Sequence, residues 1–247
     1  MRKIIILLAS ICLFSCKNEI EQTKTTSNQL KDSTKIGIKE NETVLKIDTF
    51  KLENLATLKI VDKLVISLLK KETSKDYLEK AFYKLDFYNK ETLMKSFETS
   101  IAVDEEEGEW SINNDIFENN YKFIEISYGY AACGYTQTNF LFYIDKNNSH
   151  LVTKNESMAD GGYGTWTSYE PIFKENVFIS FTSKIVQVES DDSKPYNKNN
   201  ENLIINYSDS IIYRQQSNIW VENKITQKGK VYRKEYKLFN NYYKQDN

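Results

Sequence analysis

The sequence predicts an α+β fold, in which a helical N-terminal third packs on an antiparallel β-sheet of about seven to nine strands. Apolar residues between Leu55 and Leu85 recur at spacings of three and four, which is typical of amphipathic helices. After Trp110, short runs of β-branched and aromatic residues alternate with turn-forming clusters. The chain has 247 residues, of which 40% are hydrophobic, and this suits one domain of ordinary size.

The first elements of the domain follow from these patterns in order. Alternation from Val44 to Lys51 indicates a short strand. A helix is then predicted by Leu55, Leu58, Val61, Val65 and Leu68, and a second helix by Leu78, Ala81, Phe82 and Leu85. A third, shorter helix is expected over residues 92–100. The run from Leu64 to Leu69 is also apolar enough for a strand, so the first of these helices has an alternative.

The remainder of the domain has the composition of strands. Seven segments are rich in β-branched and aromatic residues: 123–128, 140–144, 177–181, 185–188, 203–207, 211–214 and 220–223. No helical pattern connects them, so we expect antiparallel pairing in a meander or a barrel-like sheet.

The first sixteen residues have the pattern of an export signal. Arg2 and Lys3 precede an apolar run from Ile4 to Phe14 that only Ser10 interrupts. This run of about eleven residues is well short of the roughly 20 that a membrane-spanning helix needs. Residues 1–15 are therefore predicted to be a signal peptide.

The segment Leu13-Phe14-Ser15-Cys16 resembles the lipobox of bacterial lipoproteins. The resemblance implies that Cys16 is acylated, becomes the first residue of the mature chain and anchors it in a lipid bilayer, since each buried CH₂ contributes roughly 0.8 kcal/mol. Lys17, in place of aspartate, implies sorting to the outer membrane of the cell envelope. Cys16-Lys17-Asn18-Glu19 is also similar to the surface-export signal of Bacteroidota lipoproteins, although the exposed face stays open. The alternative is an ordinary signal peptide in which Cys16 is incidental.

The mature chain divides into a tether and a domain. Residues 16–42 contain few apolar side chains, so we expect a lipidated terminus and a flexible tether, followed by one domain over residues 43–247. The formal charge of −2 gives no attraction to nucleic acid, which is not an expected partner. With Cys12 removed and Cys16 acylated, Cys133 has no cysteine to pair with.

A glycine-rich and aromatic stretch between residues 128 and 169 is the predicted binding site. Five of the eight glycines lie there. The candidate binding residues are Tyr128, Tyr130, Tyr135, Asp160, Tyr163, Trp166 and Tyr169. Their flat, amphipathic rings suit an unknown protein, peptide or glycan ligand. The alternative is that Asp160 to Gly164 forms a hairpin turn and that the rings fill the core.

Catalytic and metal-binding patterns are weak. Cys133, His150 and Asp160 could serve nucleophilic catalysis only if the fold brings them together. Asp145 to Glu156 has partial calcium-loop spacing, but His150 replaces the required glycine, and a turn between two strands explains the same residues. Neither metal nor cofactor is expected. The sequence therefore predicts a membrane-anchored envelope lipoprotein with a non-enzymatic binding domain; the alternatives are an envelope hydrolase and a toxin-sequestering lipoprotein.

Overall fold

The computed structural model describes residues 44–52, 60–73, 79–103, 108–113, 116–117, 122–131, 134–195 and 200–244. Strands make up almost all of the regular secondary structure among these residues. The elements are β1 (Lys46–Lys51), β2 (Lys63–Thr73), β3 (Glu79–Asn89), β4 (Thr92–Val103), β5 (Glu109–Asn113), β6 (Phe123–Ala131), β7 (Tyr135–Tyr143), β8 (His150–Asp160), β9 (Tyr163–Lys174), β10 (Val177–Ser190), β11 (Asn202–Gln216), β12 (Ile219–Lys224), β13 (Arg233–Leu238) and α1 (Phe239–Tyr243).

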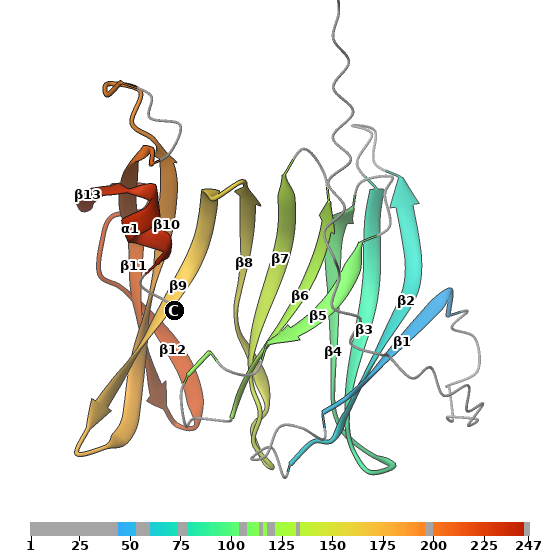
Figure 1. The fold of residues 1–247 in the computed structure, drawn as a ribbon. Helices are drawn as coiled ribbons and strands as arrows, with labels where there is room; N and C mark the ends of the chain where they lie inside the picture. Colours follow the sequence, from blue (N-terminus) through green and yellow to red (C-terminus); the bar gives the residue numbers. More distant parts are fainter. Residues whose placement is uncertain are drawn as a thin grey trace, which may run out of the picture. The chain divides into compact units, whose positions relative to one another are not determined.

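The strands form two antiparallel sheets, and within each sheet consecutive strands pair with each other, except that β13 pairs with β11 (Figure 1). The N-terminal sheet has the order β1-β2-β3-β4. The main sheet has nine strands and runs from β5 to β12 in order, with β13 pairing beside β12 along β11. The described residues belong to one compact unit.

The predicted helical third is wrong, because the described parts of this region are strands β2, β3 and β4. In β3 the buried residues Ala81, Tyr83, Leu85 and Phe87 recur at every second position and join the core with the main sheet, although Asp86 and Tyr88 are buried as well. In β2 the fully buried Leu64 and Ile66 follow the same period. The strand alternative for Leu64 to Leu69 is therefore the correct one, and the described part of the chain is all-β apart from the short helix α1.

The strands predicted after Trp110 are found, but several are longer than the sequence indicated. Residues 177–181 and 185–188 belong to the single strand β10, and residues 203–207 and 211–214 to β11. The sequence analysis did not predict β8, β9, β13 or α1. The pattern of β8, from His150 to Asp160, is largely polar, and so it gives little strand signal.

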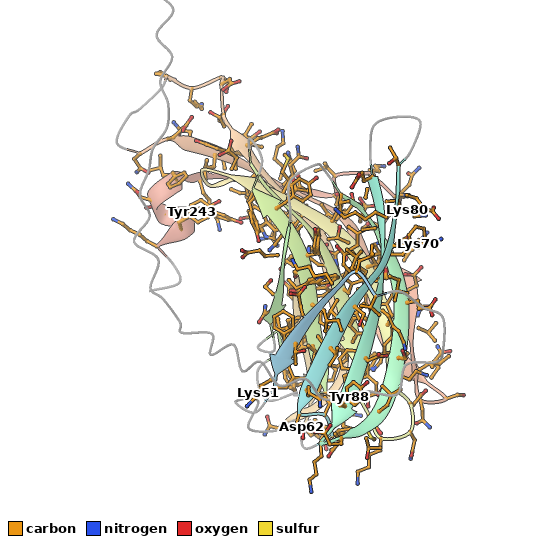
Figure 2. All side chains as sticks on the ribbon, turned by 90° about the vertical axis from the view of Figure 1, so that its right-hand side faces the viewer. Lys51, Asp62, Lys70, Lys80, Tyr88 and Tyr243 are labelled. Carbon is orange, nitrogen blue, oxygen red and sulfur yellow. The ribbon has the colours of Figure 1, made fainter. Side chains whose placement is uncertain are left out.

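The two ends of the N-terminal sheet carry different groups, as Figure 2 shows. Lys70 and Lys80 lie at one end, and their ammonium groups are 4.3 and 5.2 Å from the centre of the Phe82 ring. Asp62 and Tyr88 lie at the other end, where the Asp62 carboxylate accepts a hydrogen bond of 2.7 Å from the backbone N–H of Lys90. Between these two ends, the N-terminal sheet packs against the main sheet through apolar side chains.

Strands β6 and β7 form a middle layer with apolar contacts on both faces. On one face, Ile124, Ile126 and Phe140 join the core of the N-terminal sheet. On the opposite face, Phe123 and Leu141 join a second aromatic cluster with Phe181 of β10 and Tyr213 of β11. This double burial explains why residues 140–144 form a continuous apolar run.

The main sheet separates into two parts at the β8–β9 hairpin. The two strands pair only from Met158 to Thr165, next to the turn. Farther from the turn, β8 pairs only with β7, whereas β9 pairs only with β10. The second aromatic cluster lies between the two parts of the sheet.

Candidate functional site

The loop from Asp160 to Gly164 is a tight hairpin turn, as the alternative interpretation predicted. Gly161 and Gly162 have φ angles of +56° and +95°, and Asp160 pairs with Tyr163 across the turn. Gly164, at φ +142°, has no space for a side chain, because a Cβ would lie 2.0 Å from the carbonyl oxygen of Met158. Asp160 is exposed on this turn.

The predicted aromatic residues do not share one surface. Tyr128 is buried in the core between the two sheets, where its hydroxyl accepts a hydrogen bond of 3.0 Å from the N–H of Gly108, and Tyr130 packs against the same core. Tyr163 and Trp166 belong to a third apolar cluster, which Phe239 and other residues of α1 contact. Most of the predicted rings therefore have structural positions.

Tyr169 packs in the second aromatic cluster, with its ring centre 6.0 Å from that of Phe181. Burial raises the pKa of its hydroxyl, and the nearby Glu125 and Tyr213 raise it further. Its oxygen accepts a hydrogen bond of 2.8 Å from the Asn155 amide, which connects β9 to β8. Tyr169 is thus a member of a polar arrangement that sequence reasoning did not detect.

Tyr135 differs from the other predicted rings because 42% of its surface is exposed. Its side chain lies across Gly129 on the neighbouring strand: a Cβ at Gly129 would be 2.6 Å from the Tyr135 hydroxyl oxygen and 2.9 Å from Cγ of Gln137. Gly129 and Gln137 are cross-strand partners. The ring therefore lies on the face of β6 and β7 that also carries Gln137.

This same face carries a row of polar side chains that we call the polar ladder: Glu125 and Ser127 of β6, Gln137 and Asn139 of β7, and Asn155 and Ser157 of β8. Strand register places them together, because Ser127 pairs with Asn139, Asn139 with Asn155, and Gln137 with Ser157. Residues that are directly paired across strands point to the same side of the sheet. The polar ladder continues the face on which Leu141 meets the second aromatic cluster.

Hydrogen bonds connect five members of the polar ladder: Ser127, Gln137, Asn139, Asn155 and Ser157. Ser127 donates to the Asn139 amide oxygen at 2.7 Å. The Asn139 amide nitrogen lies 3.2 Å from the Asn155 oxygen and 3.0 Å from the Ser157 hydroxyl, and Ser157 donates to Gln137 at 3.4 Å. Ser127 and Asn139 are buried, whereas Gln137, Asn155 and Ser157 are half-buried. The ladder thus has a fixed, buried centre and an accessible border.

Glu125 is the titratable member of the polar ladder. Burial raises the pKa of its carboxyl group, and a hydrogen bond from the Asn113 side chain opposes this effect in part. No cation of the described residues contributes to its pKa. Because an isolated charge is costly to bury, the environment favours the neutral acid or a ligand that hydrogen-bonds to the carboxylate.

The catalytic candidates do not converge within the described residues. His150 accepts a hydrogen bond of 3.1 Å from the backbone N–H of Trp220, so one of its ring nitrogens has a structural partner. Asp160 lies at the other end of β8. Cys133 and the lipidation candidate Cys16 lie outside the described residues.

The calcium-loop segment is a turn between β7 and β8, as the simpler interpretation predicted. A surface cavity of about 320 Å³ lies beside it, lined by Lys122, Asp145 and five other polar or aromatic residues. Lys122 approaches the Asp145 carboxylate at 2.6 Å and lowers its pKa. No cluster of three or more potential metal ligands exists among the described residues.

No helix in the described part of the chain is both long and apolar enough to cross a membrane. Comparisons with protein-family models, with curated protein sequences and with solved structures find no match to this chain. The polar ladder and Tyr135 are thus identified as the candidate site from their geometry. Of the residues predicted from sequence, Tyr135 and Tyr169 belong to this site, whereas the polar ladder itself was missed.

Proposed function

We propose that this protein is a bacterial envelope lipoprotein, anchored by acylated Cys16, whose domain binds a ligand without transforming it. The sequence from Met1 to Cys16 supports the anchor, since a charged start and a short apolar run end at a lipobox-like cysteine. Several acyl chains on one residue hold a soluble domain stably at a bilayer. Lys17 favours the outer membrane as its location.

The polar ladder is the observation that supports binding. Polar groups inside a sheet lower stability unless they are hydrogen-bonded, and a fully apolar face would be simpler to pack. Here amide and hydroxyl groups hold one another in fixed positions, with half-buried Gln137 and Ser157 at the border. A preorganised row of this kind suits the binding of a polar ligand, because few side chains lose freedom when the ligand arrives.

The anchor is tested on the native product by mass spectrometry, which should find residue 16 as the first residue and three acyl chains on it. The Cys16→Ala variant should stay unprocessed and lose its lipid. A free Cys16 thiol, or a retained signal peptide in the wild type, would contradict the anchor.

Binding is tested by capture from detergent-solubilised envelopes. We expect the double variant Gln137→Ala/Ser157→Ala to lose a ligand that the wild type retains. The control is Glu156→Gln, an exposed position on β8 beside Ser157 that points to the other side of the strand. If the double variant and the control capture the same material, the polar ladder is not the binding site.

A hydrolase is the second candidate function, and the environment of Glu125 favours it. A carboxyl group whose pKa is raised by burial can act as a general acid, and Tyr169 lies close enough for the Glu125 charge to affect its pKa. On this alternative, Glu125→Gln abolishes turnover while binding persists. On the proposed function, no turnover exists to be lost, and the ligand is recovered chemically unchanged.

A further inference from the structure

Tyr135 gives the polar ladder an accessible aromatic surface. The ring is 42% exposed and lies over Gly129, where the absence of a side chain allows its close approach. Gln137, the next residue on the same face of β7, belongs to the polar ladder. One face therefore presents an exposed ring directly beside a row of amide and hydroxyl groups.

This combination matches the surface of a sugar. Each sugar hydroxyl both donates and accepts hydrogen bonds, and the side chains of Gln137, Asn155 and Ser157 do the same. The apolar C–H face of a sugar ring packs on an aromatic ring, while its hydroxyls extend sideways toward planar amides. Both kinds of contact are available at the border of the polar ladder, where the side chains are half-buried.

An extended peptide fits this face less well. Peptides that bind to sheets usually add a strand and use the backbone groups of a free edge. Strand β7 has no free edge, because it pairs with β6 over residues 135–143 and with β8 on its other side. Only side chains are available to a ligand here, and this favours a ligand whose own polar groups lie on its periphery.

We propose that Tyr135 and the polar ladder form a binding site for an oligosaccharide. Tyr135 stacks on one sugar ring, and Gln137, Asn155 and Ser157 hydrogen-bond to its hydroxyls. This inference rests on the proposed binding function, for which it names the class of ligand.

The experiment uses the full mature lipoprotein in detergent, titrated by calorimetry with maltohexaose, cellohexaose and chitohexaose. We expect at least one of them to bind. Tyr135→Ala should weaken that binding at least about tenfold, whereas Tyr135→Phe, which keeps the ring, should bind within about threefold of the wild type. The control Tyr232→Ala removes a tyrosine of similar exposure, 46%, elsewhere in the domain and should have no effect.

The glycan assignment is overturned if none of the three neutral probes binds, or if Tyr135→Ala binds them as tightly as Tyr232→Ala does. Melting temperatures of the variants within a few degrees of the wild type show that a loss of binding is not a loss of fold. If the probes fail while capture from envelopes still depends on Gln137 and Ser157, the glycan inference is wrong and the binding function stands. If neither probe binding nor capture from envelopes depends on the polar ladder, both the glycan inference and the proposed binding function are wrong.

Discussion

His150 and Trp220 are joined by a hydrogen bond across 70 residues of sequence: the backbone N–H of Trp220 donates to Nε2 of His150 at 3.1 Å. His150 begins β8 and Trp220 lies in β12, although β9, β10 and β11 separate these strands in the sheet. This part of the sheet therefore curls until its two end strands meet. Because Nε2 accepts, the proton is on Nδ1, which lies 3.0 Å from the carbonyl oxygen of Asn148.

Replacing His150 should destabilise the domain without affecting any ligand binding. His150→Ala leaves the half-buried Trp220 N–H without its acceptor, and we expect a loss of about 1 kcal/mol, the lower end of the range for an unsatisfied buried donor. The measurement is the free energy of unfolding in urea. Leu151→Ala, at the neighbouring and exposed position, is the control and should change stability little. Equal stability of the two variants would show that the hydrogen bond does not hold the curled sheet together.

Two glycines of the β8–β9 hairpin should respond very differently to the same substitution. A Cβ at Gly161 meets no atom within 4 Å, so Gly161→Ala has only the strain of φ +56°, about 1 kcal/mol. A Cβ at Gly164 would lie 2.0 Å from a backbone oxygen of β8, and the strands cannot separate without losing their short pairing. We expect Gly164→Ala to lose more than about 3 kcal/mol.

Thermal unfolding of the two alanine variants, measured side by side, checks this difference. If both lose the same stability, Gly164 is not in close contact with β8, and the hairpin geometry is wrong.

The strands that could be predicted from the sequence are those whose buried segments consist mostly of apolar and aromatic residues. Residues 140–143 are continuously apolar or aromatic, residues 177–181 are so except for Ser180, and both segments lie in strands. The helices were mispredicted because residues four positions apart lie on the same face both in a helix and in a strand. Ala81 and Leu85 are such a pair. The intervening Tyr83, which is also buried, supports only the strand.

The candidate site could not be predicted, because the polar ladder exists only when three strands are in register. In β7 alone, Tyr135, Gln137 and Asn139 alternate with other residues as on a solvent-facing strand. Their partnership with Ser127 and Asn155 depends on pairing, and a slip of one residue would turn them to the opposite face. Tyr135 was predicted as a binding residue from its glycine-rich setting, but its position over Gly129 required the structure.

The stability of the domain should depend on pH through Glu125. Burial raises the pKa of this carboxyl group, so the folded protein holds the proton more tightly than the unfolded chain does. The favourable contribution of the neutral acid is therefore complete below the unfolded pKa of glutamate, and it is lost as the pH rises through the folded pKa. Glu125→Gln should stabilise the protein at neutral pH and reduce the loss of stability above about pH 4.5.

Urea unfolding at a series of pH values tests this expectation. Glu156→Gln, which removes an exposed carboxylate from β8, controls for net charge. If the two variants have the same pH profile, Glu125 is not desolvated in the folded protein.

The indole of Trp220 gives the last prediction. Its ring lies among Phe123, Phe178 and Phe181, with centroid distances of 5.3, 5.8 and 5.5 Å. The Nε1 atom is buried and has no hydrogen-bond partner among the described residues. Trp220→Phe therefore removes an unsatisfied donor together with some packing, and the two effects oppose each other. We expect a change in stability within about 1 kcal/mol, against a loss of about 3–5 kcal/mol for Trp220→Ala. A Trp220→Phe variant as unstable as Trp220→Ala would show instead that the indole N–H has a partner, and that the second aromatic cluster is closed by a polar contact.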